Sequence, residues 1–276
     1  MGWAVGDFLS VFPTRKIGAY SFAFWNNIIW FLIFIPFYPF FLNDFNHLSH
    51  LGFFILFVVS ILDLIGLIFF YEGLKAGPVA LVGTIGASFA ALVVVFSLIF
   101  LRETITAVQL ISIIVIFIGL FLSTLDLQAL KKGKLTLSKG IIFAFIAMAC
   151  WGIGYTFIKL PIKEMGWFWP NAFIGFMFPL FYLFLRLRKI KIVSPNYNNA
   201  FGVLIICSLL YAVGGTAFNY ALSLGFSSIV APISGAYPAL LALLAFIFLK
   251  EKIIKQQIFG IIITILGIVL LAFYST

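Results

Sequence analysis

The stretch GFSSIVAPISGAYPALLALLAFIFLKEK, from Gly225 to Lys252, decides the fold because the chain contains it twice. A shift of 148 positions places it without a gap on GPVALVGTIGASFAALVVVFSLIFLRET, residues 77–104. Residues four apart share one helix face, where small side chains let two helices approach closely. Both copies carry such a series, formed by Gly83, Ala87 and Ala91 in the first and by Ala231, Gly235 and Ala239 in the second. The chain therefore has one closely packing helix in each half.

The same offset relates residues far from these two stretches. It places Trp3 on Trp151, Gly6 on Gly154, Gly66 on Gly214, Phe70 on Phe218 and Gly119 on Gly267. Matches spread this widely at one constant offset indicate an internal duplication.

The composition excludes a soluble domain, because 64% of the 276 residues are hydrophobic, 9% are charged and the mean hydropathy is +1.23. A soluble domain of this composition would have an apolar surface. The net charge of +9 comes from Lys and Arg clusters between apolar runs. That distribution sets membrane topology, so the bilayer is an expected partner and nucleic acid is not.

The residues give no reason to expect a cofactor, a metal or a disulfide. His47 and His50 form an HxxH pattern with no Cys or Glu beside it, and Cys150 and Cys207 lie in apolar segments as packing residues. No cleavable signal peptide is expected, since the chain opens with Trp3 and Asp7 rather than with a basic stretch.

Ten apolar segments predict an all-α integral membrane fold of ten helices. The first half gives residues 2–12, 19–41, 51–71, 79–101 and 106–125, and the second gives 140–162, 168–187, 200–222, 228–249 and 256–273. Residues 1–125 form the first five-helix repeat, 126–139 a polar Lys-rich linker and 140–276 the second repeat. The first segment is too short to cross a bilayer. We expect either that about nine residues of it precede Met1 or that it is a half-span packed against protein.

An odd number of spans per half predicts that the halves insert with opposite orientation, as an inverted repeat. Three of the 17 Lys and Arg residues lie in loops on one side, namely Arg102, Lys159 and Lys163. The others lie in loops after the first, third, fifth, seventh and ninth spans. The excess of positive charge predicts that these loops are cytoplasmic and that both termini are outside.

The sequence resembles that of the EamA family of the drug/metabolite transporter superfamily. The resemblance rests on Trp151, Gly152 and Lys159 in one span and on Ala221, Leu222, Gly225, Ala231, Pro232, Ser234, Pro238 and Glu251 further on. The first half departs from the pattern, with Ala4 for the Gly and Val11 for the Lys. The resemblance implies ten helices in two inverted halves, a cavity lined mainly by helices 1, 3, 4, 6, 8 and 9, and movement of small metabolites without ATP. Family members are often drawn with cytoplasmic termini; for this chain we follow the charge distribution.

Two acids lie inside predicted spans, where a carboxylate is costly and commonly functional. Asp63 is near the middle of the third span, one turn before Gly66, and its repeat partner is Tyr211. It is a candidate for proton coupling or for binding a substrate ammonium, or else a structural acid capped by hydroxyls or water. Asp7 raises the same question, but near a helix end it could simply be solvated.

Other polar and aromatic residues complete the candidate site. Lys159 could extend to the interface or bind an anionic substrate group, and Asn26 and Asn27 could face a cavity or bond between helices. Pro232 and Pro238 free backbone carbonyls in the ninth span, as in transporter helices broken near a substrate. The remaining candidates are Trp3, Thr84, Ser88, Trp151, Tyr155, Phe218, Asn219, Ser234 and Tyr237.

Small residues also recur in the fifth and tenth spans, as Ser112, Gly119, Gly260 and Gly267. Their spacing by seven indicates a helix contact. That contact could form a homodimer or lie within one half.

These features together predict a secondary transporter of the plasma membrane. It would move a small polar metabolite, with an amino-acid-like compound as first guess, by alternating access and with coupling to protons through Asp63. The alternatives are a facilitative carrier of sugars or nucleobases and a non-transporting scaffold or sensor. An enzyme is not expected, because no catalytic constellation lies in the apolar helices.

Overall fold

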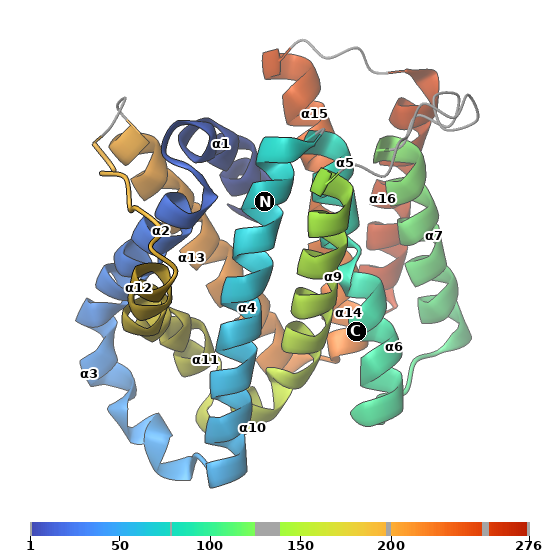
Figure 1. Cartoon of the computed structure of the whole chain (residues 1–276). Helices are drawn as coiled ribbons and strands as arrows, with labels where there is room; N and C mark the ends of the chain where they lie inside the picture. Colours follow the sequence, from blue (N-terminus) through green and yellow to red (C-terminus); the bar gives the residue numbers. More distant parts are fainter. Residues whose placement is uncertain (1, 78, 125–138, 197–199, 250–253, 275–276) are drawn as a thin grey trace.

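The computed structural model describes residues 2–77, 79–124, 139–196, 200–249 and 254–274, and all regular secondary structure among them is helical (Figure 1). In the first half the helices are α1 (Gly2–Ile17), α2 (Ala19–Phe34), η1 (Ile35–Phe37), α3 (Tyr38–Phe41), η2 (Leu42–His47), α4 (His50–Ala76), α5 (Val79–Ala87), α6 (Phe89–Phe100) and α7 (Ala107–Thr124). In the second half they are α9 (Lys139–Phe157), α10 (Lys159–Met165), α11 (Phe168–Ala172), η3 (Phe173–Met177), α12 (Phe178–Leu187), α13 (Ala200–Leu224), α14 (Ser227–Gly235), α15 (Tyr237–Leu249) and α16 (Lys255–Phe273).

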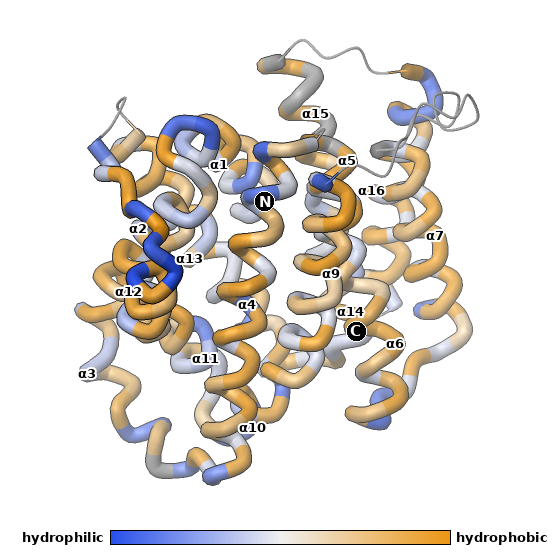
Figure 2. The backbone as a smooth tube through the Cα atoms, in the orientation of Figure 1, coloured by the Kyte–Doolittle hydropathy of each residue, from blue (hydrophilic) through white to orange (hydrophobic). Residues whose placement is uncertain are grey.

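Among the described residues, seven helical segments are long and apolar enough to cross a bilayer, and two shorter apolar helices cover residues 107–123 and 227–241. Figure 2 shows hydrophobic residues along the helices, and hydrophilic residues at the top and bottom of the bundle and in a segment beside α12 at its left. This is the pattern of a bundle whose sides face lipid.

Two predicted spans have an irregular turn at the same place in the repeat. One residue, Ser88, interrupts the helix of residues 79–101, and one residue, Ala236, interrupts the helix of residues 228–249, 148 positions later. Pro238 accounts for the second break, since a proline lacks the amide hydrogen that a helix interior requires. The first half has no proline there, but the Ser88 hydroxyl donates to the Thr84 carbonyl at 2.8 Å, a bond that bends helices.

Two further predicted boundaries differ from the structure, and a third span keeps its predicted bounds but is not α-helical throughout. The first helix does not end at residue 12 but continues through Pro13 to Ile17, and Gly18 with φ +84° follows it. The second predicted span, residues 19–41, is α-helical only to Phe34, after which short 3-10 and α turns continue to His47. The span of residues 168–187 likewise contains a 3-10 turn.

The packing joins the two halves rather than separating them. Helix α1 packs on α13, α4 on α9, α6 on α14 and α7 on α16, so each contact pairs a helix of one half with a helix of the other. In Figure 1, α4 and α9 run side by side through the middle of the bundle, and α7 and α16 do so at its right side.

The small residues of the fifth and tenth predicted spans lie in the α7–α16 contact. A Cβ atom added to Gly267 would lie 2.8 Å from Cγ1 of Ile116, and one added to Gly119 would lie 2.9 Å from the Gly260 carbonyl oxygen. These faces therefore meet each other between the halves. A homodimer through the same helices would have to use their outward faces, where Ile118 and Ile265 are exposed.

Candidate functional site

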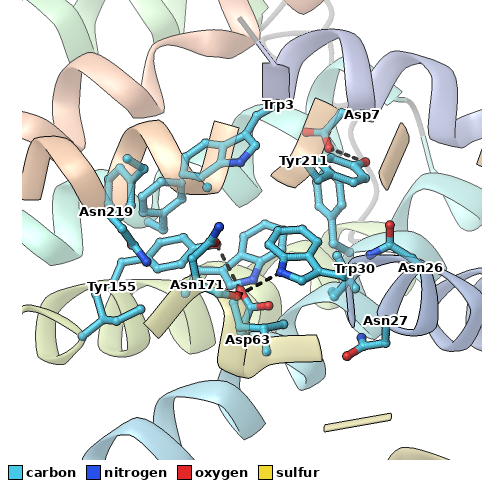
Figure 3. Close-up of a pocket in the computed structure, with 18 of the residues that line it drawn as sticks. Trp3, Asp7, Asn26, Asn27, Trp30, Asp63, Tyr155, Asn171, Tyr211 and Asn219 are labelled. Carbon is cyan, nitrogen blue, oxygen red and sulfur yellow. Dashed lines mark hydrogen bonds between the residues drawn. The ribbon is translucent and has the colours of Figure 1, made fainter. Parts of the chain in front are cut away.

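A cavity of about 70 Å³ lies where α1, α4, α9 and α13 meet, and its walls come from both halves (Figure 3). It has room for several waters or for part of a small organic molecule. The sequence candidates that line it are Trp3, Asp7, Asp63, Trp151, Tyr155, Tyr211, Phe218, Asn219 and Tyr237. The structure thus brings together residues up to 234 positions apart in the chain.

Two hydrogen bonds between an acid and a phenol cross the cavity walls. The Tyr211 hydroxyl on α13 donates to Oδ1 of Asp7 on α1 at 2.9 Å. The Tyr155 hydroxyl on α9 donates to Oδ1 of Asp63 on α4 at 3.1 Å. The repeat offset of 148 places Asp7 on Tyr155 and Asp63 on Tyr211, so the same contact occurs twice with acid and phenol exchanged between the halves.

Asp7 is buried, with 5% of its surface exposed, so the interpretation of it as a simply solvated acid is wrong. Its position is set by close contact of α1 with α13. A Cβ atom added to Gly6 would lie 2.8 Å from Cε1 of Tyr211. Glycine at residue 6 therefore leaves the space in which the Tyr211 ring lies beside the carboxyl.

The tryptophans are accommodated in the same way. A Cβ atom added to Gly66 would lie 2.7 Å from Nε1 of Trp151, and one added to Gly214 would lie 2.7 Å from Cδ1 of Trp3. Gly66 and Gly214 are repeat partners, as are the two tryptophans. A larger residue at either glycine would displace the indole that forms the cavity wall.

Aromatic rings surround Trp3. It stacks on Tyr155 with ring centroids 5.9 Å apart and planes 10° apart, and it lies 5.2 Å from Phe218. Phe89 and Tyr237 are also repeat partners, and each packs edge-on against Trp3 with ring centroids 6.2 Å apart. Such faces bind apolar bodies by contact and cations through the ring quadrupole.

Four asparagines also line the cavity, and two of them form hydrogen bonds to other side chains of the protein. Asn26 Oδ1 accepts from the Ser208 hydroxyl at 2.8 Å, which is the helix–helix bond considered from the sequence. Asn171 Nδ2 donates to the Thr216 hydroxyl at 2.8 Å. Asn27 donates to the Ala23 carbonyl at 3.4 Å, but its own Oδ1 has no partner in the part of the chain that the structure describes.

A hydrogen-bond donor on the cavity wall, Nδ2 of Asn219, is also without a partner among the described residues. Its side chain is buried, with 3% of its surface exposed. Buried polar atoms in folded proteins are nearly always bonded, so unpartnered donors around a cavity indicate a place for a polar ligand or water.

Lys159 has backbone partners that the sequence did not indicate. Its ammonium group is buried and donates to the carbonyl oxygens of Leu222 and Gly225, where α13 ends. These carbonyls have no partner within the helix, and a positive charge suits the negative end of a helix dipole. Lys159 therefore fixes the connection between α13 and α14 and does not line the cavity.

Glu103 holds the other end of the same connection. Its Oε1 accepts from the amide of Ser227 at 2.9 Å, and its Oε2 accepts from the amide and the hydroxyl of Ser228 at 2.8 and 2.7 Å. A carboxylate at the first turn of a helix satisfies amides that lack partners and suits the helix dipole. The repeat partner of Glu103 is Glu251, which lies outside the described residues.

The aliphatic hydroxyls predicted for the site, those of Thr84, Ser88 and Ser234, do not line this cavity. Ser88 bonds to the Thr84 carbonyl, and Ser234 lines a neighbouring recess with Gly2 and Gly214. Two polar lining residues were missed, Trp30 and Asn171. Asn171 could have been found, because it is an amide in an apolar span like Asn26, whereas a Trp in an apolar run gives no such signal.

Comparison with known proteins agrees with this architecture. The model of the EamA-like transporter family matches residues 1–125 and 138–273, which is nearly the whole chain. The chain belongs to the EamA-like transporter family. It is therefore a multi-pass membrane protein of transporter type, as the sequence motifs predicted.

Two individual matches add detail on this EamA-like transporter. The chain is 30% identical over 135 residues to the uncharacterized protein MJ1333.1 of Methanocaldococcus jannaschii, an alignment that covers 48% of this chain and 95% of the relative. The relative is thus about as long as one half of the chain. A crystal structure with 13% identity superposes with a TM-score of 0.70 over 99% of this chain and 95% of the other, which shows a shared fold.

Proposed function

We propose that this EamA-like protein is a secondary carrier that moves a small polar metabolite across the plasma membrane by alternating access. The observation that carries the proposal is the cavity between the halves, with one acid–phenol pair on the α1–α13 contact and its repeat counterpart on the α4–α9 contact. Carriers of duplicated architecture bind their substrate at the interface of the two repeats.

The carrier would contain ten spans arranged as two inverted five-helix repeats, residues 1–125 and 140–276. Three observations support this arrangement: the helix breaks at Ser88 and Ala236, the exchanged acid–phenol pairs, and a relative of about half the length. The loops rich in Lys and Arg would face the cytoplasm.

An exchange of this kind suggests how access could alternate. If the α1–α13 contact opened toward one side of the membrane and the α4–α9 contact toward the other, Asp7 and Asp63 would be exposed in turn. Each carboxyl could then release a proton or a cationic group to one compartment. This is the basis on which we propose coupling to protons.

Counterflow in proteoliposomes tests the function. The purified chain would be reconstituted with an unlabelled metabolite inside and the labelled compound outside, for amino acids, amines, sugars and nucleobases, with and without an imposed pH gradient. Accumulation of one class is the expected result, and dependence on the gradient would support proton coupling. Accumulation that ignores the gradient would indicate a facilitative carrier. Folded protein that accumulates no compound would contradict a transport function.

A further inference from the structure

The charge of the cavity restricts what it can hold. Asp7 and Asp63 line it, whereas none of its described lining residues is Lys, Arg or His. Lys159, which the sequence offered as an anion-binding group, is occupied by two backbone carbonyls at the end of α13. The acids thus have phenol partners but no cationic partner on the cavity wall. An ionised carboxyl inside a membrane protein is stabilised by a countercharge, and the described residues of the cavity wall do not supply one.

The rest of the wall fits a cation with an organic body. Three aromatic rings lie beside Asp63, with centroids 5.2 to 5.9 Å apart, and belong to Trp3, Tyr155 and Phe218. Aromatic rings attract ammonium groups more strongly when water is excluded. Nδ2 of Asn219 has no partner among the described residues and would bond a neutral acceptor, such as a hydroxyl oxygen.

We propose that the cavity selects organic amines without a carboxylate, carrying an apolar or aromatic body and a neutral acceptor group. This inference rests on the proposed transport function and narrows its substrate to one class. A zwitterionic amino acid would satisfy one acid with its ammonium, but it would bring a carboxylate into a cavity that holds a second acid and no Lys, Arg or His among its described lining residues. Like charges repel strongly where water is scarce. The amine that lacks the carboxylate avoids that penalty.

Matched pairs that differ only by the carboxylate test this selection. Tyramine and tyrosine, histamine and histidine, and agmatine and arginine would be compared as competitors and as counterflow substrates of the full chain in proteoliposomes. We expect the amine to bind at least about tenfold more tightly than its amino acid in each pair that binds, which corresponds to about 1.4 kcal/mol. Equal or tighter binding of the amino acids, or no binding of any amine, would overturn the proposal.

Variants connect the selection to the two acids. D7N and D63N should each weaken amine binding and reduce the difference between amine and amino acid. E72Q is the matched control, because Glu72 lies nine residues after Asp63 on α4 and does not line the cavity. Size-exclusion elution and thermal unfolding show whether each variant is folded. A folded pair of variants with unchanged preference for the amines would assign the selection elsewhere and overturn the role of the acids.

The same experiments separate this inference from the proposed function. Counterflow of a sugar, a nucleobase or an amino acid in preference to every amine would overturn the amine class and leave the carrier function standing. Absence of counterflow for every compound, from folded protein, would contradict both.

Discussion

The Tyr155 hydroxyl donates to Oδ1 of Asp63 at 3.1 Å, so a carboxyl of the first half is held by a phenol of the second. The exchanged contact, in which Tyr211 donates to Asp7 at 2.9 Å, lies on another wall of the same cavity (Figure 3). A duplicated chain that kept identical residues in both halves would place acid beside acid or phenol beside phenol at these contacts. The exchange of residue type lets both contacts be hydrogen bonds.

Removing either phenol hydroxyl tests whether the two contacts contribute equally. Y155F and Y211F each delete one donor to a carboxyl and keep the ring that packs in the wall. A hydrogen bond of this kind contributes about 1 kcal/mol, so we expect KM for a transported amine to rise about fivefold in each variant.

Counterflow rates over a range of substrate concentrations give these KM values, and Y182F, whose ring is exposed on α12, is the control. An effect in one variant only would mean that the two contacts have different roles.

Replacing Asp63 by Asn removes the charge and keeps the shape. In the unmodified protein, acidification protonates the carboxyl and removes its attraction for a cation, so KM for an amine should rise as the pH falls. D63N should have a higher KM that changes less with pH, because Asp7 is then the remaining acid among the described lining residues. The other titratable groups near Asp63 are Tyr155 and Cys150 on α9 and Tyr71 on α4, and Asp7 lies across the cavity.

The measurement is counterflow at a series of pH values, equal on both sides of the membrane. The same series for D7N shows how much Asp7 contributes to the change of KM with pH. A D63N protein that keeps the pH profile of the unmodified chain would remove Asp63 from the coupling role.

The parts of the site that the sequence could predict are those that the duplication repeats. Trp3, Asp7, Trp151 and Tyr155 share equivalent places in their halves, and polar or aromatic residues at such places in apolar helices indicate a shared cavity. Lys159 could not be assigned in this way. Its partners are backbone carbonyls, which every residue has, so only the packing of α10 against α13 shows which ones it meets.

The irregular turn at Ser88 could not be predicted from the sequence either. The equivalent residue of the second half, Ala236, lies near Pro238, and a proline predicts an interrupted helix. A serine in a helix is compatible with a straight span. The bond to the Thr84 carbonyl depends on the rotamer that the surrounding helices allow. Local sequence therefore located one of the two breaks and tertiary packing determined the other.

Lys159 should be a stability residue. K159M keeps the aliphatic stem but leaves the carbonyls of Leu222 and Gly225 without their donor, and an unpartnered buried polar group costs about 1 to 3 kcal/mol. We expect a lower midpoint of thermal unfolding in detergent and an unchanged order of preference among substrates.

K163M is the control, because Lys163 lies one turn further along α10 and is exposed. If K159M instead kept full stability and lost binding of anionic compounds selectively, Lys159 would belong to the substrate site after all.

Glu103 should stabilise the same connection from its other end. E103Q keeps one acceptor oxygen but removes the charge that faces the first turn of α14. Loss of a helix cap costs about 0.5 to 2 kcal/mol, so E103Q should lower the unfolding midpoint by an amount similar to K159M. The double variant shows whether the two residues act together, since residues that hold one segment give effects that do not add. Fully additive effects would mean that Lys159 and Glu103 stabilise separate parts of the protein.

Gly235 tests how closely the duplicated helices approach. A Cβ atom at residue 235 would lie 2.6 Å from Cβ of Ala90 and 3.1 Å from the Ala87 carbonyl oxygen, in the contact between α14 and α6. G235L should therefore separate these helices, destabilise the protein by about 1 to 3 kcal/mol or more, and misfold or lock the carrier. The matched pair is G235A alone and together with A90G, because the second change removes the atom that a new methyl group would meet first. We expect G235A to lower the unfolding midpoint and the double variant to restore part of the loss. Normal transport and stability of G235L would show that α14 and α6 do not depend on this close contact.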